Sequence, residues 1–341
     1  MIIHAKAPLR IGLAGGGTDV SPYCDIYGGY ILNACITMYA YATIEPMDNC
    51  RIEFFCADRN QNGVFDSKES LEIDDNFKLM TGVYNRIVKD YTHKPLSFKL
   101  TTYVDAPAGS GLGSSSTLVV AIVKAFQEWL NLPLSEYDIA KLAWSIERED
   151  LQMAGGKQDQ YASTFGGFNF MEFRGEKVLV NPLRIKQEYL NELEFNILLF
   201  YTGTSRLSAK IIENQSENAK KKKSKTLNAM DKIKQFSYDM KEALLTGNLR
   251  KMGDLLNDGW TYKKQMSDSI SNPMIDNIYE TALRAGATGG KISGAGGGGF
   301  FMFYCPDNTR YKVIEELKKL GGEFRRYRFT SKGAESWTAC Q

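Results

Sequence analysis

Short blocks of apolar residues, some alternating with polar ones, predict the β-strands of this chain. In residues 97–104, Phe98, Leu100 and Val104 share one face of an extended backbone, because side chains alternate sides with a period of two. Similar blocks, rich in aromatic and β-branched residues, predict further strands. They lie at residues 1–10, 30–36, 39–45, 51–56, 165–173, 195–201 and 300–304.

Apolar residues spaced three or four apart predict helices between these strands. Ser135, followed three residues later by Asp138, has the pattern of an N-cap at the start of one of them. Residues 58–75 are polar and predict a loop, with a turn at Asn62-Gly63. The other predicted helices lie at residues 77–91, 117–126, 227–245, 249–265, 272–285 and 309–320.

The chain has 341 residues, enough for two domains that each have a core. A polar connection separates the predicted strand at 165–173 from the one at 195–201, and no repeat or low-complexity linker interrupts the chain. We therefore expect a domain boundary near residue 190, with one domain at residues 1–190 and the other at residues 191–341.

Composition excludes several classes of function. Lysine and arginine number 42 against 40 aspartate and glutamate residues, a net charge of +2 that predicts neither a nucleic-acid nor a membrane partner. The six cysteines form no Cys-x-x-Cys pair, and no apolar stretch has the form of a membrane span or a signal peptide, so we expect reduced thiols and a cytoplasmic location. The two histidines, His4 and His93, lie near no nucleophile or metal-spacing motif. Any catalysis must therefore use carboxylates, lysines, arginines, hydroxyls and a bound metal.

The stretch from Pro107 to Ser116, Pro-Ala-Gly-Ser-Gly-Leu-Gly-Ser-Ser-Ser, lies between a predicted strand and a predicted helix, as a phosphate-binding loop does. Its glycines remove Cβ atoms that would keep an anion away from the backbone. The first N–H groups of the next helix lack internal partners, and the helix dipole favours negative charge there. The three serines add hydroxyls for capping, phosphate binding or Mg²⁺. Taken alone, these residues fit a tight turn with serine caps equally well.

Two better-known phosphate-binding motifs fit the chain less well. A Walker A motif at Gly290-Lys291 would need glycine in place of Ala285 and serine or threonine in place of Ile292. The Gly-x-Gly-x-x-Gly spacing of dinucleotide-binding loops occurs at residues 294–299, but a predicted strand follows it where a helix is required.

Arg10 precedes a three-glycine turn, residues 15–17, that ends in Thr18-Asp19. The glycines would let a sugar approach the backbone, and Asp19 would accept hydrogen bonds from its hydroxyls. The alternative is an ordinary turn capped by the aspartate.

Charged residues farther along the chain are candidates for the chemistry, although each is also compatible with a solvated surface. Glu147 lies at the end of a predicted helix, and Asp159 follows twelve residues later, after a Gly-Gly turn. Lys157 would contact phosphate or be solvated. Arg206 and Lys210, four residues apart, would face an anionic substrate group or, more simply, solvent.

Together these stretches resemble the motifs of the GHMP small-molecule kinases. Residues 7–19 resemble the first, sugar-binding motif, and residues 287–300 resemble the third. The central motif, Pro-x3-Gly-Leu-x-Ser-Ser, is matched by Pro107, Gly111, Leu112, Ser114 and Ser115. The resemblance implies an α+β, two-domain GHMP kinase fold, with a ribosomal-protein-S5-like N-terminal domain and a ferredoxin-like C-terminal domain. It also implies ATP and Mg²⁺ as cofactors.

The resemblance implies a role for each candidate residue. Residues 156–160 match the Gly-x-x-Asp-Gln pattern of galactokinase, which places Asp159 at the reacting hydroxyl and Arg10 beside it, to keep that carboxylate ionised and stabilise charge. Glu147 would hold Mg²⁺ with Ser115, and Glu149 is the alternative ligand. ATP phosphates would bind Pro107, Gly109, Ser110, Gly111, Leu112, Gly113, Ser114, Ser115 and Ser116. The sugar would bind Gly16, Gly17, Thr18, Asp19, Lys157, Arg206, Gly294 and Gly296.

The first motif also bears on the substrate, because Gly16-Gly17 replaces the Glu-His pair that grips galactose in galactokinase. This implies a sugar other than galactose, such as a larger one. Residues 10–19, 146–150, 155–161 and 165–170 resemble the bacterial D-glycero-α-D-manno-heptose 7-phosphate kinases, which phosphorylate the anomeric hydroxyl. The implied partner is a small-molecule sugar phosphate, the product a 1,7-bisphosphate for nucleotide-heptose synthesis, and the assembly a monomer or homodimer. Alternatives are a kinase for fucose, galactose or an N-acetylhexosamine, a non-catalytic sugar sensor of the same fold, and a decarboxylase, which the sugar-type first motif disfavours.

Overall fold

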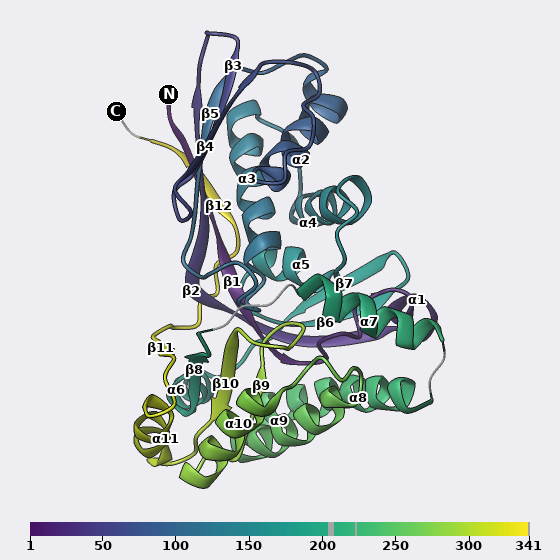
Figure 1. The fold of residues 1–341 in the computed structure, drawn as a ribbon, viewed down its shortest axis with the longest axis vertical. Coiled ribbons are helices and arrows are strands. Elements are labelled where there is room, and N and C mark those ends of the chain that lie inside the picture. Colours follow the sequence, from purple (N-terminus) through teal and green to yellow (C-terminus); the bar gives the residue numbers. More distant parts are fainter. Residues whose placement is uncertain (204–207, 222–223, 340–341) are drawn as a thin grey trace.

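The computed structural model describes residues 1–203, 208–221 and 224–339, which are organised around two β-sheets (Figure 1). The first sheet has eight strands in the order β12-β1-β2-β5-β3-β4, with β6 paired to β2 and β7 paired to β6. All of its pairings are antiparallel except the parallel pair β3 and β5. Its strands are β1 (Ile3–Ala14), β2 (Gly29–Pro46), β3 (Arg51–Cys56), β4 (Gln61–Asp66), β5 (Phe98–Val104), β6 (Phe168–Arg174), β7 (Lys177–Pro182) and β12 (Glu335–Thr338).

Helices of the N-terminal half cover one side of this sheet in the upper part of Figure 1. The apolar helix α3 packs directly against β1 and β2, and α2 and α4 pack against α3. The helices of this half are α1 (Tyr23–Tyr27), α2 (Lys78–Ile87), α3 (Ser114–Leu130), α4 (Glu136–Ser145) and α5 (Gln158–Phe165), with π-helical segments η1 (Val88–Thr92) and η2 (Ile146–Asp150).

The second sheet is antiparallel, with strand order β11-β8-β10-β9, and lies in the lower part of Figure 1. Its strands are β8 (Ile197–Tyr201), β9 (Gly289–Ile292), β10 (Phe300–Tyr304) and β11 (Glu323–Arg325). The helices of this half are α6 (Gln187–Asn196), α7 (Ser208–Lys220), α8 (Ser224–Thr246), α9 (Leu249–Lys264), α10 (Pro273–Ala285) and α11 (Thr309–Lys318).

Strand β1 is buried on both faces along its second half. Leu9, Ile11 and Leu13 face a hydrophobic cluster that includes residues of α8, α9 and β10. Arg10 and Gly12 face the opposite way, toward α5. This two-sided burial explains the nearly continuous apolar sequence of the strand. It also means that the core of the second half continues into the first sheet.

The end of the chain returns to the first sheet. Strand β12 pairs with β1, a bridge joins Phe329 to Ile36, and β12 lies beside the N-terminal strand in the upper part of the molecule (Figure 1). The predicted domain division near residue 190 remains a prediction. Residue 190 itself lies inside α6, and residues 335–338 belong to the first sheet.

Two sequence-based assignments were wrong. The two strands predicted at residues 30–36 and 39–45 form one long strand, β2. Residues 37 and 38 stay extended across an irregularity in the pairing with β1, where the Thr37 N–H donates to the Arg328 carbonyl oxygen at 2.9 Å. The polar loop predicted at residues 58–75 contains β4, an edge strand in which Gly63 lies opposite Phe54 of β3. An edge strand with an exposed face carries little hydrophobic signal, so its polar sequence was mistaken for a loop.

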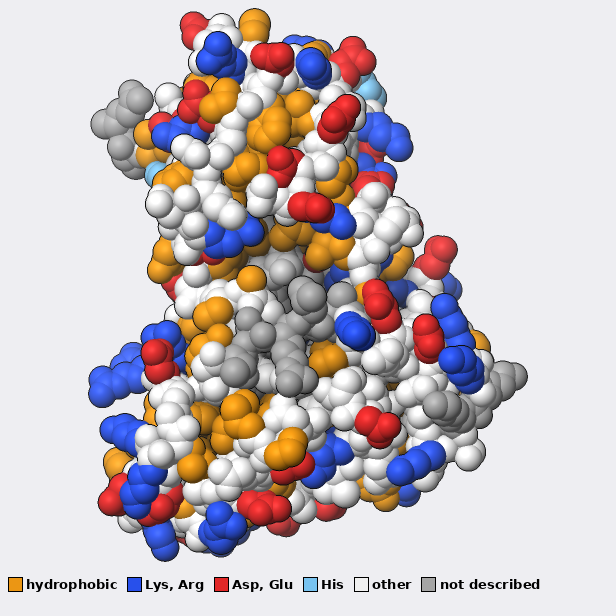
Figure 2. All heavy atoms as spheres, viewed as in Figure 1, with side chains coloured by type: hydrophobic (Ala, Val, Ile, Leu, Met, Phe, Trp, Pro, Cys, Tyr) orange, Lys and Arg blue, Asp and Glu red, His pale blue; other side chains and the backbone are white. Residues whose placement is uncertain are grey.

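Lysine, arginine and acidic side chains are interspersed over the face shown in Figure 2 and form no patch of a single sign there. None of the described helices is long and apolar enough to span a lipid bilayer. The five cysteines among the described residues are all free thiols.

The shared core predicts that both halves of the protein unfold together. Ile11 is fully buried in the cluster that joins β1 to α8 and α9, so Ile11→Ala should lower the free energy of unfolding by about 2–5 kcal/mol. Urea denaturation followed by both tryptophan fluorescence and circular dichroism should show one shifted transition. Val64→Ala, at an exposed edge position, is the matched control. Two separate transitions, with just one of them shifted, would contradict a shared core.

Candidate active site

Arg10 is the centre of the site, and its side chain is almost completely buried. The guanidinium Nε and Nη2 atoms contact Asp159 Oδ1 at 2.7 and 2.6 Å. Nη1 donates to the carbonyl oxygen of Gly111 at 2.6 Å and to the hydroxyl of Ser293 at 3.3 Å. One side chain therefore joins β1, the first turn of α5, the phosphate-loop candidate and the glycine-rich segment before β10.

Asp159 remains accessible although it is paired with Arg10. Its side chain is 22% exposed, whereas that of Arg10 is 3% exposed. Gly113 lies directly beside it, and a Cβ at that position would be 3.1 Å from the Asp159 carboxyl carbon. The glycine therefore lets the carboxylate stand next to the start of α3, with one side open to a ligand.

The backbone of the central loop has the geometry expected of an anion-binding loop. Gly109, Gly111 and Gly113 all have positive φ, between 72° and 86°, which disfavours any residue with a side chain there. Helix α3 begins at Ser114, three residues earlier than predicted, with Gly113 as its N-cap and no side-chain cap. The three serines thus form the first turn of the helix, and free N–H groups of this turn face the loop.

The third glycine-rich segment packs against this loop. A Cβ on Gly111 would lie 2.1 Å from the Ser293 carbonyl oxygen, and one on Gly294 would lie 2.8 Å from Gly111 Cα. The Phe300 N–H donates to the Ser110 carbonyl at 2.9 Å. Gly296 lies against Ile270. These glycines allow two backbone segments from opposite halves of the chain to touch.

Asp19 has a structural role that the sequence did not reveal. Its Oδ2 accepts hydrogen bonds from the backbone N–H groups of Lys157 and Gln158, at 2.9 and 3.1 Å, and so caps α5 from a distant part of the chain. Its Oδ1 is buried and has no hydrogen-bond partner among the described residues. Burial raises the pKa of this carboxyl above its usual value. The free oxygen still suits a sugar hydroxyl.

Thr18, also predicted to contact the sugar, is turned into the protein. Its hydroxyl is shared between the carbonyl oxygens of Gly15 and Tyr30, at 2.9 and 3.0 Å. Gly16 and Gly17 are half-buried and so remain accessible at the turn. A cleft of about 410 Å³ opens beside Asp19 and is also lined by Lys157 and Trp144.

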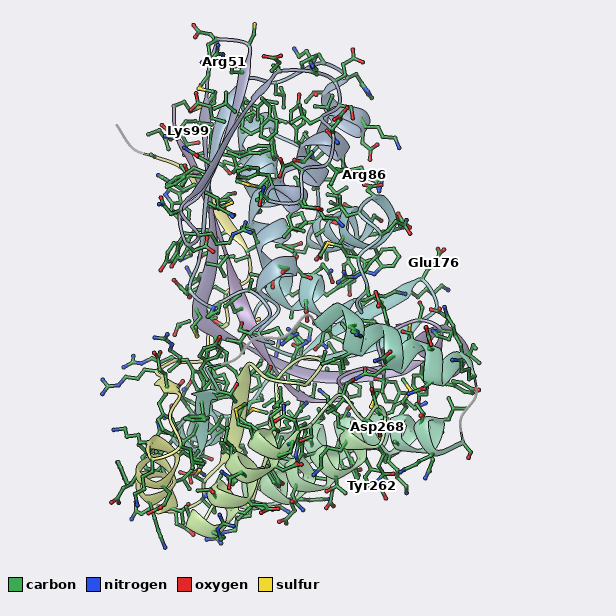
Figure 3. All side chains as sticks on the ribbon, in the orientation of Figure 1. Arg51, Arg86, Lys99, Glu176, Tyr262 and Asp268 are labelled. Carbon is green, nitrogen blue, oxygen red and sulfur yellow. The ribbon has the colours of Figure 1, made fainter. Side chains whose placement is uncertain are left out.

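Glu147 lies at the base of the loop and is 1% exposed. Its carboxylate accepts hydrogen bonds from Ser116 Oγ at 3.0 Å and from Gln160 Nε2 at 2.5 Å, and it lies 3.8 Å from Arg148. Burial is the largest cause of a pKa raised above the usual value for this carboxyl. The alternative ligand, Glu149, pairs instead with Arg86, which projects from α2 on the outer flank in Figure 3.

The oxygen atoms near Glu147 fit a Mg²⁺ ion. Gln160 Oε1 is buried and has no partner among the described residues, and Ser115 lies half-buried in the first turn of α3. Carboxylate, amide and hydroxyl oxygens are the ligands that Mg²⁺ prefers, and it usually takes one or two carboxylates together with substrate phosphates. Within the described ranges, no group of three or more histidine, cysteine or acidic side chains is arranged to hold a metal.

The cations predicted to face the substrate are dispersed. Lys157 donates to the carbonyl of Gly175 and lies over the ring of Trp144, 5.4 Å from its centroid. Lys210 is exposed on α7. Arg206 lies outside the described residues. Neither Lys157 nor Lys210 forms a hydrogen bond or ion pair with Arg10 or Asp159 among the described residues.

Sequence reasoning missed two buried lysines at the site, Lys263 on α9 and Lys291 on β9. It also missed Ser293, which binds Arg10, and Gln160, which binds Glu147. Lys291 lies within the third glycine-rich motif, so its position offered a signal. Lys263 lies in a helix whose apolar residues have the usual helical spacing, so nothing in the sequence marked it as a site residue.

Comparison with known proteins shows two family matches. The GHMP kinases N terminal domain matches residues 78–167, and the GHMP kinases C terminal domain matches residues 240–323. The chain is 49% identical over 336 residues to the D-glycero-alpha-D-manno-heptose 7-phosphate kinase of Campylobacter jejuni, covering 98% of both chains.

Solved structures agree with these matches. A structure described as a D-glycero-D-manno-heptose 1-phosphate kinase from Bacteroides thetaiotaomicron superposes with a TM-score of 0.85 at 45% identity, covering 99% of this chain and 100% of the other. The mevalonate kinase of Methanococcus jannaschii superposes with a TM-score of 0.75 at 22% identity, covering 97% and 98%. The latter likeness shows the fold alone.

The buried Glu147 carboxyl predicts a pH-dependent stability difference. The pKa of Glu147 is raised in the folded state above its usual value of 4.5. Between the usual pKa and the raised pKa, the folded protein therefore binds more protons than the unfolded chain. The free energy of unfolding then falls as the pH rises from one value to the other. Glu147→Gln removes this contribution. The metal-free variant should therefore gain stability relative to wild type as the pH rises from about 4 to about 7.5, which melting temperatures across this range would measure.

The pKa of Asp19 is raised as well, but Asp19 is present in both wild type and Glu147→Gln, so its contribution to stability cancels in the comparison. Glu149→Gln, at an exposed carboxylate, is the control and should show no such trend. A Glu147→Gln variant that loses stability relative to wild type toward neutral pH would contradict the argument.

Proposed function

We propose that this chain, which belongs to the GHMP kinases and is a sugar kinase, transfers the γ-phosphoryl group of ATP to the anomeric hydroxyl of D-glycero-D-manno-heptose 7-phosphate. The product is then the 1,7-bisphosphate. Support for this substrate comes from the identity of 49% with a kinase named for it. A heptose whose C1 already carried phosphate would have no free anomeric hydroxyl to accept the group, so the 7-phosphate is the consistent acceptor.

The observation that carries the proposed chemistry is the Arg10–Asp159 pair at the mouth of the glycine loop. Asp159 is partly exposed and its second oxygen is not used by Arg10. We assign it to orient the sugar hydroxyl and accept its proton. Arg10 holds the carboxylate in place and puts a fixed positive charge beside the position where the phosphoryl group transfers.

The central loop and the start of α3 suit the phosphates of ATP. Positive-φ glycines leave the backbone open between Gly109 and Gly113, and the N-terminus of a 17-residue helix follows at once. Ser110 Oγ is buried and has no partner among the described residues, so it offers one further hydrogen bond to a ligand.

Mg²⁺ is assigned to Glu147 and Ser115, as the family resemblance implies. When bound there, the ion would neutralise charge on the phosphate oxygens. Ser116 is already engaged with both Glu147 and Gln160, so we assign it to position the Glu147 carboxylate. Ser115 lies one residue closer to the loop and forms the accessible hydroxyl.

The alternative functions are less well supported. A kinase for fucose or galactose would resemble relatives at 28% identity or less, such as the Thermococcus kodakarensis galactokinase. A non-catalytic sensor would have no need of Asp159 and Glu147 in these positions. Both acidic side chains are present and hydrogen-bonded as a working site requires.

Removing the proposed proton acceptor should stop turnover without preventing nucleotide binding. Asp159→Asn should reduce kcat by about 10²–10⁴-fold, because that is the usual contribution of a proton-transfer group, and leave the KM for ATP within a few-fold of wild type. Steady-state kinetics with heptose 7-phosphate measures both quantities. Asp150→Asn, which removes a surface partner of Arg86, is the control. Near wild-type kcat in Asp159→Asn would show that another group takes the proton.

The two neighbouring serines provide a test of the metal assignment. Ser115→Ala should raise the Mg²⁺ concentration for half-maximal turnover by at least about 10-fold, because it removes a ligand. Ser116→Ala should have the smaller effect, since Gln160 still holds the Glu147 carboxylate. Titration of Mg²⁺ at saturating ATP gives both values. The opposite order of effects would identify Ser116 as the ligand.

A further inference from the structure

Two lysine side chains from the second half of the chain end beside the sugar-binding turn. Lys263 follows Tyr262, which Figure 3 marks on α9 in the lower half of the molecule, and Lys291 lies on β9. The two side chains are 3% and 6% exposed. A Cβ placed on Gly16 would lie 3.9 Å from the Nζ atom of each. Both ammonium groups therefore converge on a single glycine of the turn.

Neither lysine forms a salt bridge with a carboxylate within the described ranges. Lys291 donates to the carbonyl oxygen of Gly12 at 2.9 Å, and Lys263 donates to the carbonyl oxygen of Gly294. The nearby Arg10 is already paired with Asp159. Each lysine therefore retains donors without an anionic partner.

Two buried lysines without anionic partners cost the protein free energy when no ligand is bound. Burial lowers the pKa of Lys263 to about 8, with a further decrease from Arg10, and burial together with Lys263 lowers the pKa of Lys291 well below its usual value. Buried charges persist in proteins where they are paired or bind a ligand. A dianion placed between them would restore their protonated forms.

The turn leaves an approach to these lysines. Gly16 has no side chain and is half-buried, so a ligand atom in the place of a Cβ at this position would lie within contact distance of both ammonium groups. A cavity behind Gly15 and Gly16, which the lysines also line, measures about 20 Å³. That volume holds one water molecule and no phosphate, so an anion must enter from the open side of Gly16.

We propose that Lys263 and Lys291 form the binding site for the phosphate that the sugar substrate already carries, and so select a phosphorylated sugar over a free one. This inference rests on the proposed function, because it assigns the 7-phosphate of the heptose to these residues. Gly16 and Gly17 provide the opening through which that phosphate reaches them.

The position of the lysines favours the sugar phosphate over the phosphates of ATP. Their common neighbour is Gly16 of the sugar-binding turn, and the charge of Asp19, the proposed sugar-hydroxyl acceptor, acts on Lys263. The glycine loop at residues 109–113 contacts Ser293, Gly294 and Asp159, and Gly294 is the one of these three that a lysine also binds, through its carbonyl oxygen. That loop also has the N-terminus of α3 to bind nucleotide phosphates.

The test compares one sugar with and without its phosphate. Purified wild type, Lys263→Met, Lys291→Met and the double variant are assayed with D-glycero-D-manno-heptose 7-phosphate and with the unphosphorylated heptose. Each single variant should raise the KM for the phosphorylated sugar by about 10- to 100-fold, because each removes a charge-assisted hydrogen bond. The KM for the free heptose and the KM for ATP should change less than about 3-fold.

A control variant on α9 distinguishes the loss of a positive charge on this helix from the loss of a phosphate-binding side chain. Lys264, the next residue, is partly exposed and pairs with Asp276, so Lys264→Met removes the same charge on the outside of α9 and should leave every KM unchanged. Methionine keeps the apolar stem of lysine, and melting temperatures should not fall. Lys263→Gln and Lys291→Gln provide second variants if either methionine variant folds poorly.

Other outcomes would overturn the inference. Unchanged KM for the phosphorylated sugar in both single variants would exclude these lysines, and an equal rise for both sugars would show a general effect on the cleft. A rise confined to the KM for ATP would assign the lysines to the nucleotide phosphates. Failure of the proposed substrate is recognised separately, because wild type itself would then not phosphorylate heptose 7-phosphate.

Discussion

The buried guanidinium of Arg10 is the constraint on which the site depends. Arginine stays protonated inside proteins, and a buried charge is tolerated when its hydrogen bonds are satisfied. Arg10 meets this requirement through Asp159, the Gly111 carbonyl and the Ser293 hydroxyl, which come from three distant segments. Satisfying one side chain therefore brings Asp159, the candidate phosphate loop and the third glycine-rich motif to the same place.

Glycines make that convergence possible. The loop at Gly111 and the segment at Gly294 lie so close that a side chain on either would collide with backbone of the other. Leu112 of the loop belongs to the hydrophobic cluster that joins Ile11 of β1 to helices α8 and α9. Residues from both halves thus hold the site, and neither half contains the complete set.

The site is electrostatically prepared for anionic ligands. Asp159 neutralises Arg10, whereas Lys263 and Lys291 have carbonyl partners and no carboxylate partner among the described residues. The carboxylate of Glu147 is bound by Ser116 in the first turn of α3, where a cation suits it. This arrangement suits the transfer that we propose, from ATP with Mg²⁺ to a phosphorylated sugar.

The amino-acid sequence by itself determined the motifs, their order and the family, and it predicted most helices and strands. These features depend on neighbouring residues, through periodicity and glycine spacing, so they can be read locally. Tertiary structure alone decided that Asp19 caps α5, that Ser116 and not Ser115 binds Glu147, and that Lys263 reaches Gly16. Each of these contacts joins residues far apart in the chain or chooses between adjacent side chains about 100° apart on a helix, and no local pattern encodes that choice.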